Sequence, residues 1–341
     1  MLAAGAPGAQ LVALQDGAVV VDAVAGDALR WRDDAGELAE LAEADRERVT
    51  ADTWFDLASL TKLFTAAVVL RLRERGELDL DEPIARRLPG AAAGAATLRQ
   101  LLTHTAGLPA TDGLERVPGT AADRWAALRA IAPIAAPGAA HCYSCVGYLL
   151  AGAIVKAVTG EDLATHVGEL ITGPLGMSAG YRPADPRACA ATEFQPELGR
   201  GMVRGVVHDE SAWSLGGVAG NAGLFANARA VARFAEMIRR GGLDGQGRRI
   251  LAADSVAEML TPHPAPGAAY RQGIGFRLGD FERTGSATSV GHPGFTGTLL
   301  VIEPAQGRTL VLLSNAIHPR RDAVDKTAVY RAALRSVWPP R

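Results

Sequence analysis

Cysteine and lysine are both scarce in this sequence. Its 341 residues include 3 cysteines, and among its 35 basic residues only Lys62, Lys156 and Lys326 are lysines. An odd and small number of cysteines does not supply the disulfide framework of a secreted domain. Because lysine is so rare, a lysine at a meaningful spacing from another polar residue is more informative than usual.

Long hydrophobic runs and an excess of positive charge are missing as well. No stretch of about 18 residues is apolar and uncharged, so we expect no membrane span. The opening segment is interrupted by Pro7, Gln10 and Asp16, and its first basic residue is Arg30, which is not the pattern of a secretory signal. With a net charge of −2, the chain lacks a basic field for nucleic acid or an anionic membrane. We therefore expect a cytoplasmic protein that binds neither.

Several common site motifs are also absent. The sequence contains no H-E-x-x-H metal helix, no P-loop and no G-x-G-x-x-G turn. Nucleotide-dependent chemistry and zinc proteolysis therefore lose their support.

The order of local patterns predicts the fold class. The length allows about two compact units at roughly 150 residues per domain. Residues 30–50 are charged and irregular, which predicts a surface loop or a short helix. The other predicted elements are a hairpin over 10–24 closed at Asp16-Gly17, strands over 274–278, 298–303 and 309–315, and helices over 60–76, 98–103, 146–158, 228–240 and 324–337.

Strand patterns thus lie near both ends of the chain, and mainly helical patterns lie between them. This order predicts an α/β (α+β) fold whose antiparallel sheet is assembled from both termini and flanked by helices. We expect residues 1–62 and 272–341 to form the sheet domain and residues 63–271 to form an inserted, mainly helical domain. The active site is then expected at their interface.

The first candidate for chemistry is Ser59-Leu60-Thr61-Lys62 at the start of a predicted helix. Residues three apart share one face of a helix, so the two side chains can meet. A lysine that is desolvated enough for its neutral form to be accessible can take the serine proton. The alternative interpretation of this short motif is a helix cap beside a solvated lysine.

Two further short motifs add a phenol and an imidazole. Tyr143 stands just before the helix predicted from residue 146, and His292-Pro293-Gly294 precedes the strand predicted from Thr298. A phenol can relay a proton, and a glycine beside a strand allows close approach of a substrate. Taken alone, Tyr143 is also explained as a core tyrosine and His292 as part of a turn.

Together, these motifs resemble those of the serine β-lactamase and penicillin-binding-protein superfamily. More specifically, the sequence is similar to class C β-lactamase-related serine hydrolases, a group of esterases, D-amino-acid peptidases and acyltransferases. The resemblance covers roughly residues 8 to 335. Its most family-like stretches are Thr53 to Lys62 (TWFDLASLTK), Leu98 to Pro109 (LRQLLTHTAGLP), His208 to Phe225 and Gly291 to Leu299.

The resemblance implies a β-lactamase-like fold and a role for each motif. Ser59 is implied to be the acylated nucleophile, with Lys62 and Tyr143 sharing the proton transfers. The backbone N–H groups of Ser59 and Phe295 are implied to form the oxyanion hole. No metal or organic cofactor is implied.

Two departures from the family pattern bear on the substrate, which Cys145, His292 and Gly294 are expected to contact. His292 replaces the lysine of the lactamase K-T-G triplet, and Pro293 replaces its hydroxyl residue, which argues against β-lactams and peptidoglycan peptides. Cys145 stands where the family usually carries Asn or Asp, and a thiol is a weak donor and acceptor. Cys142 and Cys145 also form a C-x-x-C pair, but a redox or zinc role lacks the expected context.

The remaining polar residues of these stretches are expected to brace loops. His208, Asp209 and Glu210 would fix one end of the glycine-rich segment 216–223, and His104 and Thr105 would brace the loop after their helix. The sequence therefore predicts a hydrolase or acyltransferase that takes a small ester, thioester or amide as acyl donor and water, an amine or an alcohol as acceptor. The alternatives are a D-aminopeptidase, a residual β-lactamase, or an inactive binding module.

Overall fold

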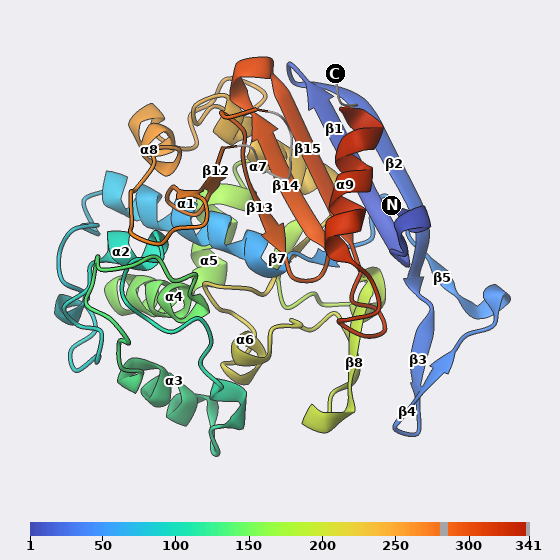
Figure 1. Ribbon diagram of the computed structural model, residues 1–341, viewed down its shortest axis with the longest axis horizontal. Coiled ribbons are helices and arrows are strands. Elements are labelled where there is room, and N and C mark those ends of the chain that lie inside the picture. Colours follow the sequence, from blue (N-terminus) through green and yellow to red (C-terminus); the bar gives the residue numbers. More distant parts are fainter. Residues whose placement is uncertain (280–285, 339–341) are drawn as a thin grey trace.

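The computed structural model describes residues 1–279 and 286–338 (Figure 1). Within them, an antiparallel sheet of eight strands has the order β11-β12-β13-β14-β15-β1-β2-β5. The strands are β1 (Gly8–Gln15), β2 (Ala18–Leu29), β5 (Glu47–Arg48), β11 (Arg271–Gln272), β12 (Arg277–Leu278), β13 (Val290–Gly294), β14 (Thr298–Glu303) and β15 (Arg308–Ser314). Because β1 pairs with β15, the two ends of the chain meet in one sheet, and the predicted fold class is confirmed.

The first hairpin forms where the sequence predicts it. Asp16 and Gly17 both have positive φ, 51° and 86°, as a two-residue turn between right-twisted strands requires. The turn sets the register that places Leu14 opposite Val19. Period-2 alternation along these strands then sends successive side chains to opposite faces of the sheet.

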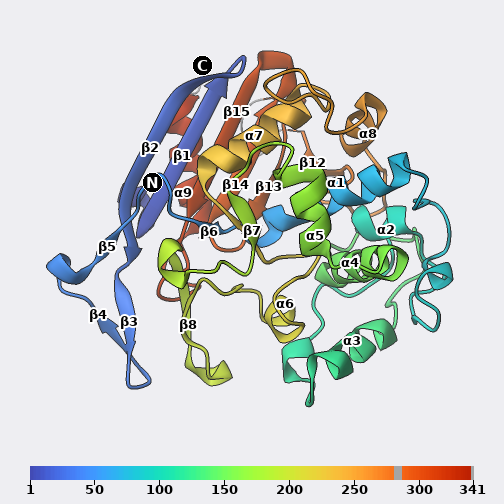
Figure 2. The same ribbon diagram turned by 180° about the vertical axis from the view of Figure 1, so that it is seen from behind.

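Each face of the sheet is covered by helices, as Figures 1 and 2 show from opposite sides. The terminal helix α9 (Lys326–Val337) packs on the face that presents Leu299, Val301 and Leu310. The other face presents Leu300 and Ile302 to a larger core, against which α7 (Ala228–Arg239) lies.

The remaining helices form a layer beside the sheet. They are α1 (Thr61–Glu74), α2 (Leu98–Leu102), α3 (Ala121–Ala130), α4 (Cys145–Thr159), α5 (Leu163–Val167), α6 (Glu210–Ser214) and α8 (Ala253–Met259). Helix α1 is buried along nearly its whole length and contacts both α4 and α5. Among the described residues, no helix is long and apolar enough to cross a bilayer.

Two local expectations were wrong. Residues 30–50, predicted as a loop or short helix, contain the hairpin of β3 (Trp31–Asp34) and β4 (Glu37–Glu40). The strand predicted over 274–278 is reduced to β12, because Gly275 has φ 82° and bends the chain before it.

The segment between the sheet strands is less uniformly helical than expected. It contains β7 (Ala179–Tyr181) and β10 (Leu224–Ala226), which form a small sheet with β6 (Phe55–Asp56), and the pair β8 (Ala191–Gln195) and β9 (Gly201–Arg204). Helix α7 also belongs to this segment and yet covers the main sheet. The division at residues 62 and 272 therefore stays a prediction.

Candidate active site

Ser59 lies in a short 3-10 turn, Ala58–Leu60, that leads directly into α1. Ala58 has a positive φ of 46°, a conformation that is costly for a residue with a Cβ. The turn is held by Asp56, whose Oδ1 accepts the Ala58 N–H at 2.8 Å, and by the Leu57 N–H, which donates to the Leu224 carbonyl at 3.0 Å. The half-buried Ser59 side chain is thus presented at the start of a buried helix.

Two polar groups converge on the Ser59 hydroxyl. Lys62 Nζ donates to Ser59 Oγ at 3.0 Å, and Tyr143 Oη donates to the same oxygen at 3.0 Å. The first contact follows from the helical spacing of Ser59 and Lys62. The second joins residues 84 positions apart, and the structure brings all three predicted residues together.

The Lys62 ammonium is completely buried and surrounded by acceptors. Besides Ser59, it donates to the Asn221 carbonyl at 3.1 Å and to Cys145 Sγ at 3.6 Å. Burial alone lowers the pKa of Lys62, but the charges that Cys145 and Tyr143 carry when ionised, and a hydrogen bond to Tyr143, raise the pKa above its ordinary value. Burial without these neighbouring charges favours the neutral form, so the accessible neutral lysine expected from the sequence stays a prediction.

The Tyr143 segment is fastened by the loop after α2. Ser144 donates its N–H to His104 Nδ1 at 3.1 Å and its hydroxyl to the Pro109 carbonyl at 2.6 Å. The His104 ring lies 4.5 Å from the Tyr143 ring, centroid to centroid. Burial and the Lys62 charge hold the pKa of His104 well below its usual value, so the imidazole is neutral and braces the segment as predicted.

The turn after β13 is bound to the nucleophile turn. Thr296 Oγ1 donates to the Asp56 carbonyl at 2.8 Å, and Thr298 Oγ1 donates to the Leu57 carbonyl at 3.1 Å. A Cβ at Gly294 would lie 1.9 Å from Thr298 Oγ1 and 2.8 Å from the Leu57 carbonyl oxygen, so only glycine allows this approach. Phe295, the other predicted oxyanion-hole residue, follows Gly294 and is 43% exposed.

His292 does not supply a positive charge at this site. Its side chain is buried, and Nδ1 lies 2.7 Å from the Pro293 carbonyl oxygen. Burial and the charges of Arg277 and Lys62 hold its pKa well below the usual value. The imidazole is therefore neutral over the ordinary pH range.

Arg277 is a candidate residue that sequence reasoning missed. It lies on β12 directly opposite Gly291 of β13, with its guanidinium carbon 5.6 Å from the Tyr143 ring centroid and 4.3 Å from that of Tyr270. Its Nε is buried without a hydrogen-bond partner in the described part of the chain. The sequence predicted that Arg277 lies in a strand, but the strand pairing that brings it to Tyr143 cannot be predicted from a single sequence.

Glu193, His208 and Glu210 form a cluster with the spacing of a metal site, but protein groups already bind its carboxylates. Arg321 donates to both Glu193 and Glu210, and His208 Nε2 lies 2.8 Å from Glu193 Oε2. These hydrogen bonds overcome burial and hold the pKa of Glu193 well below its usual range. The cluster fixes His208, whose N–H donates to Asp56 Oδ2 at 2.7 Å and whose ring stacks on Phe295, so it braces the nucleophile turn.

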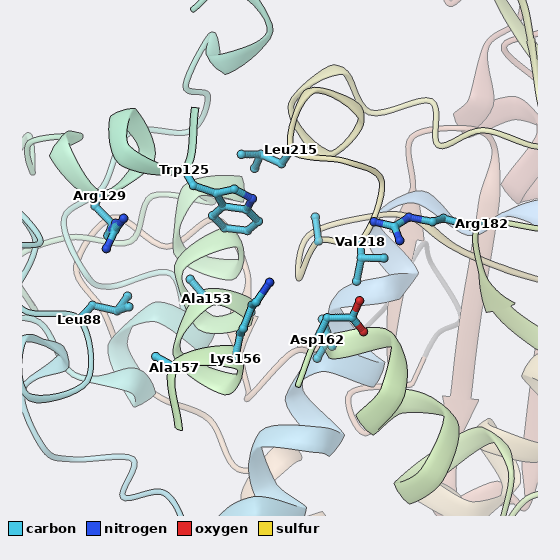
Figure 3. Close-up of a pocket in the computed structure, with 13 residues that line it drawn as sticks. Leu88, Trp125, Arg129, Ala153, Lys156, Ala157, Asp162, Arg182, Leu215 and Val218 are labelled. Atoms are coloured by element: carbon cyan, nitrogen blue, oxygen red, sulfur yellow. The ribbon is translucent and has the colours of Figure 1, made fainter. Parts of the chain in front are cut away.

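A separate pocket of about 310 Å³ lies between α4 and the start of the glycine-rich segment (Figure 3). Neither Ser59, Lys62 nor Tyr143 lines it. At its edge, Arg182 donates twice to the Gly216 carbonyl, at 2.9 and 2.7 Å. This side of the glycine-rich segment is therefore held in place independently of the Ser59 site.

Comparison with known proteins agrees with this geometry. The sequence profile of the family described as Beta-lactamase matches residues 1–334. The chain belongs to the Beta-lactamase family. It is a β-lactamase-related serine hydrolase, and the implied β-lactamase-like fold is confirmed.

Several named relatives and solved structures are similar to this member of the Beta-lactamase family. A protein of Escherichia coli (strain K12) named "Putative D-alanyl-D-alanine carboxypeptidase" is 33% identical, over 92% of this chain and 79% of that protein. A structure of SurE with D-Leu is 27% identical, with a TM-score of 0.72, over 98% of this chain and 71% of that one. EstCE1, described as a hydrolase with promiscuous acyltransferase activity, is 20% identical, with a TM-score of 0.76, over 99% of this chain and 94% of that one, and shows the fold alone.

Proposed function

We propose that this protein transfers acyl groups through an acyl-enzyme on Ser59, with a small ester, thioester or amide as the donor. The observation that supports this most directly is the convergence of Lys62 Nζ and Tyr143 Oη on Ser59 Oγ, each at 3.0 Å. A serine hydroxyl becomes an effective nucleophile when an adjacent group can take its proton. The family membership supports the same chemistry.

In this proposal the Tyr143 oxygen, in its ionised form, takes the Ser59 proton. Lys62 acts as an ammonium in this step, which its raised pKa supports. Its charge stabilises the negative charge that develops on the Ser59 oxygen. Tyr143 then returns the proton to the leaving group, and water, an amine or an alcohol attacks the ester on Ser59.

The backbone N–H groups of Ser59 and Phe295 are proposed as the oxyanion hole. Donors fixed before the reaction stabilise the developing charge without reorganising. The hydrogen bonds from Thr296 and Thr298 to the Asp56 and Leu57 carbonyls support this assignment, because they fix the Phe295 turn against the Ser59 turn.

A second candidate is a peptidase or amidase that acts on D-amino-acid substrates with a free carboxylate. Arg277 favours it, because its guanidinium lies beside Tyr143, its Nε has no hydrogen-bond partner in the described part of the chain, and a guanidinium can bind a carboxylate in bidentate fashion. The neutral His292 and Pro293 argue against this substrate class, but Arg277 supplies the missing charge from the neighbouring strand. The name of the Escherichia coli relative and the D-Leu in the SurE structure are consistent with it.

The test is the intact mass of the protein after brief exposure to p-nitrophenyl butyrate, with Ser59→Ala treated in parallel. We expect the wild type to gain the butyryl mass and to release p-nitrophenol, and the variant to do neither. A persistent adduct indicates that the enzyme awaits an acceptor other than water, and a transient adduct with continuous release indicates hydrolysis. Equal release by the wild type and Ser59→Ala would contradict the proposal.

A further inference from the structure

The departure at Cys145 leaves Lys62 with a poor partner. Two of the ammonium N–H groups donate to oxygen acceptors, Ser59 Oγ and the Asn221 carbonyl, at 3.0 and 3.1 Å. The third group faces Cys145 Sγ at 3.6 Å, and a thiol sulfur is a weak acceptor. The carboxamide that the family pattern places at position 145 would accept this hydrogen bond far better.

A carboxamide from a different element lies beside Cys145. The Asn221 side chain is completely buried, and it lies against Cys145, where it lowers the pKa of the thiol while burial raises it. Apart from this contact with the Cys145 sulfur, neither Asn221 Oδ1 nor Nδ2 has a hydrogen-bond partner among the residues that the structure describes. Burying both ends of an amide unpaired is unfavourable, so the position calls for an explanation.

The backbone on either side of Asn221 is tightly held. Thr65 Oγ1 donates to the Gly220 carbonyl at 2.8 Å, and Tyr181 Oη donates to the Ala219 carbonyl at 3.1 Å. A Cβ at Gly220 would lie 2.0 Å from the Tyr148 carbonyl oxygen, so the segment is pressed against α4. The unpaired amide is therefore built into the fold and does not arise from a loose loop.

We propose that Asn221 is a positioning residue that supplies, from the glycine-rich segment, the carboxamide that Cys145 lacks. The inference rests on the acyl-enzyme chemistry proposed above. Acylation converts Ser59 Oγ into an ester oxygen, which is a poorer acceptor than a hydroxyl, and so releases one N–H of the Lys62 ammonium. Asn221 Oδ1 then accepts from this ammonium and holds it in place while the acyl-enzyme is resolved.

The first test replaces Asn221 with leucine, which keeps the branched shape of the side chain and removes its polar atoms. With p-nitrophenyl butyrate, Asn221→Leu should lower kcat and KM together, each at least tenfold, because a slower deacylation step leaves kcat/KM unchanged. Because deacylation is slowed, the fraction of acylated protein in intact-mass spectra at steady state should rise. A role in packing alone would not raise this fraction.

Restoring the family carboxamide provides the rescue. In the Asn221→Leu background, Cys145→Asn should raise kcat at least fivefold, because an amide again faces Lys62. Asn227, which lies beyond the glycine-rich segment, serves as the control asparagine, since its Oδ1 accepts the Ala230 N–H at the start of α7. Asn227→Ala should lower the thermal midpoint of unfolding and leave kcat unchanged.

Two results would overturn the proposal. One is a folded Asn221→Leu protein with wild-type kcat and acylated fraction, and the other is an equal effect of Cys145→Asn with and without Asn221. If the wild type does not cleave this ester, the same comparisons of kcat and acylated fraction are made with a small thioester or amide donor. Turnover that survives Ser59→Ala would contradict the proposed function itself, whereas loss with Ser59→Ala and no effect of Asn221→Leu contradicts only this inference.

Discussion

At the scale of single residues, the positive charge of Arg277 lies close to the Tyr143 side chain, and it comes from a strand other than the one that carries His292. His292 occupies the position of the lactamase lysine but is neutral, and the guanidinium of Arg277 lies over the Tyr143 ring. An arginine differs from a lysine in that its planar guanidinium can hold both oxygens of one carboxylate. The preference among substrates should therefore depend on Arg277.

We predict that Arg277→Gln raises KM for a D-alanyl-D-alanine peptide about tenfold to a hundredfold, the range expected for losing a charge-assisted hydrogen bond. KM for the uncharged p-nitrophenyl butyrate should change less than about twofold, because this ester offers no carboxylate to bind. Steady-state kinetics with both substrates measures the difference. Arg271→Gln is the control, since Arg271 is exposed and donates to the Ala287 carbonyl. An equal rise of KM for both substrates would rule out carboxylate recognition.

From the residues alone, the sequence predicts only those contacts of the candidate site that join residues close together in the chain. Ser59 and Lys62 meet because they are three residues apart on one helix turn, which any sequence reveals. Tyr143 was placed by the resemblance. Asn221 is brought to the site by the glycine-rich segment, and Arg277 is brought there by strand pairing. Neither contact can be predicted from a single sequence.

At the scale of elements, the turn between β13 and β14 and the nucleophile turn act as one unit. Thr296 is buried, and its hydroxyl donates to the Asp56 carbonyl at 2.8 Å. Replacing it with valine keeps the shape and leaves that carbonyl unpaired. Because Phe295 is the adjacent residue, any shift of the turn moves its backbone N–H group.

We expect Thr296→Val to lower kcat for p-nitrophenyl butyrate about tenfold, less than the loss of a whole oxyanion-hole donor, and to destabilise the fold by about 1–3 kcal/mol. Thr309→Val is the matched control, because Thr309 Oγ1 donates to Glu236 Oε1 at 2.6 Å on β15, in the same sheet. This control should lose stability but not kcat. Urea unfolding and initial rates give both quantities, and a Thr296→Val enzyme with unchanged kcat would separate the turn from catalysis.

Elements with at least one buried face were predictable, and elements exposed on both faces were not. The strand over 298–303 was assigned correctly because its central residues, Leu299 to Ile302, are apolar and the whole strand is buried. The β3–β4 hairpin escaped prediction because Trp31–Asp34 and Glu37–Glu40 are mostly exposed and carry no apolar alternation. Its turn at Ala35 and Gly36, both with positive φ, lies in a charged stretch that resembles an ordinary loop.

At the scale of the whole molecule, His318 joins segments from the beginning, middle and end of the chain. Its Nε2 accepts the backbone N–H groups of Arg30 and Trp31, at 3.0 and 3.2 Å. Its Nδ1 lies 2.9 Å from the Thr192 carbonyl oxygen and donates to it. Both ring nitrogens are therefore used in the neutral form, and a proton on Nε2 would break two hydrogen bonds.

Acid should consequently weaken the fold through this one residue. Burial lowers the pKa of His318 from 6.5 to about 4, so between these values the unfolded chain binds more protons than the folded protein. The stability contributed by the neutral ring is present above pH 6.5 and is lost as the pH falls toward 4, with a loss of about 2 kcal/mol between pH 7 and pH 5.

In His318→Gln the residue no longer titrates, and the amide keeps one donor and one acceptor. Urea unfolding at pH 7 and pH 5 should show a variant that is less stable than the wild type at pH 7 but loses about 2 kcal/mol less on acidification. The buried His104 and His292 titrate in both proteins and cancel in this difference. Equal losses in the two proteins would show that the ring is already protonated in the folded state or that the three segments separate without it.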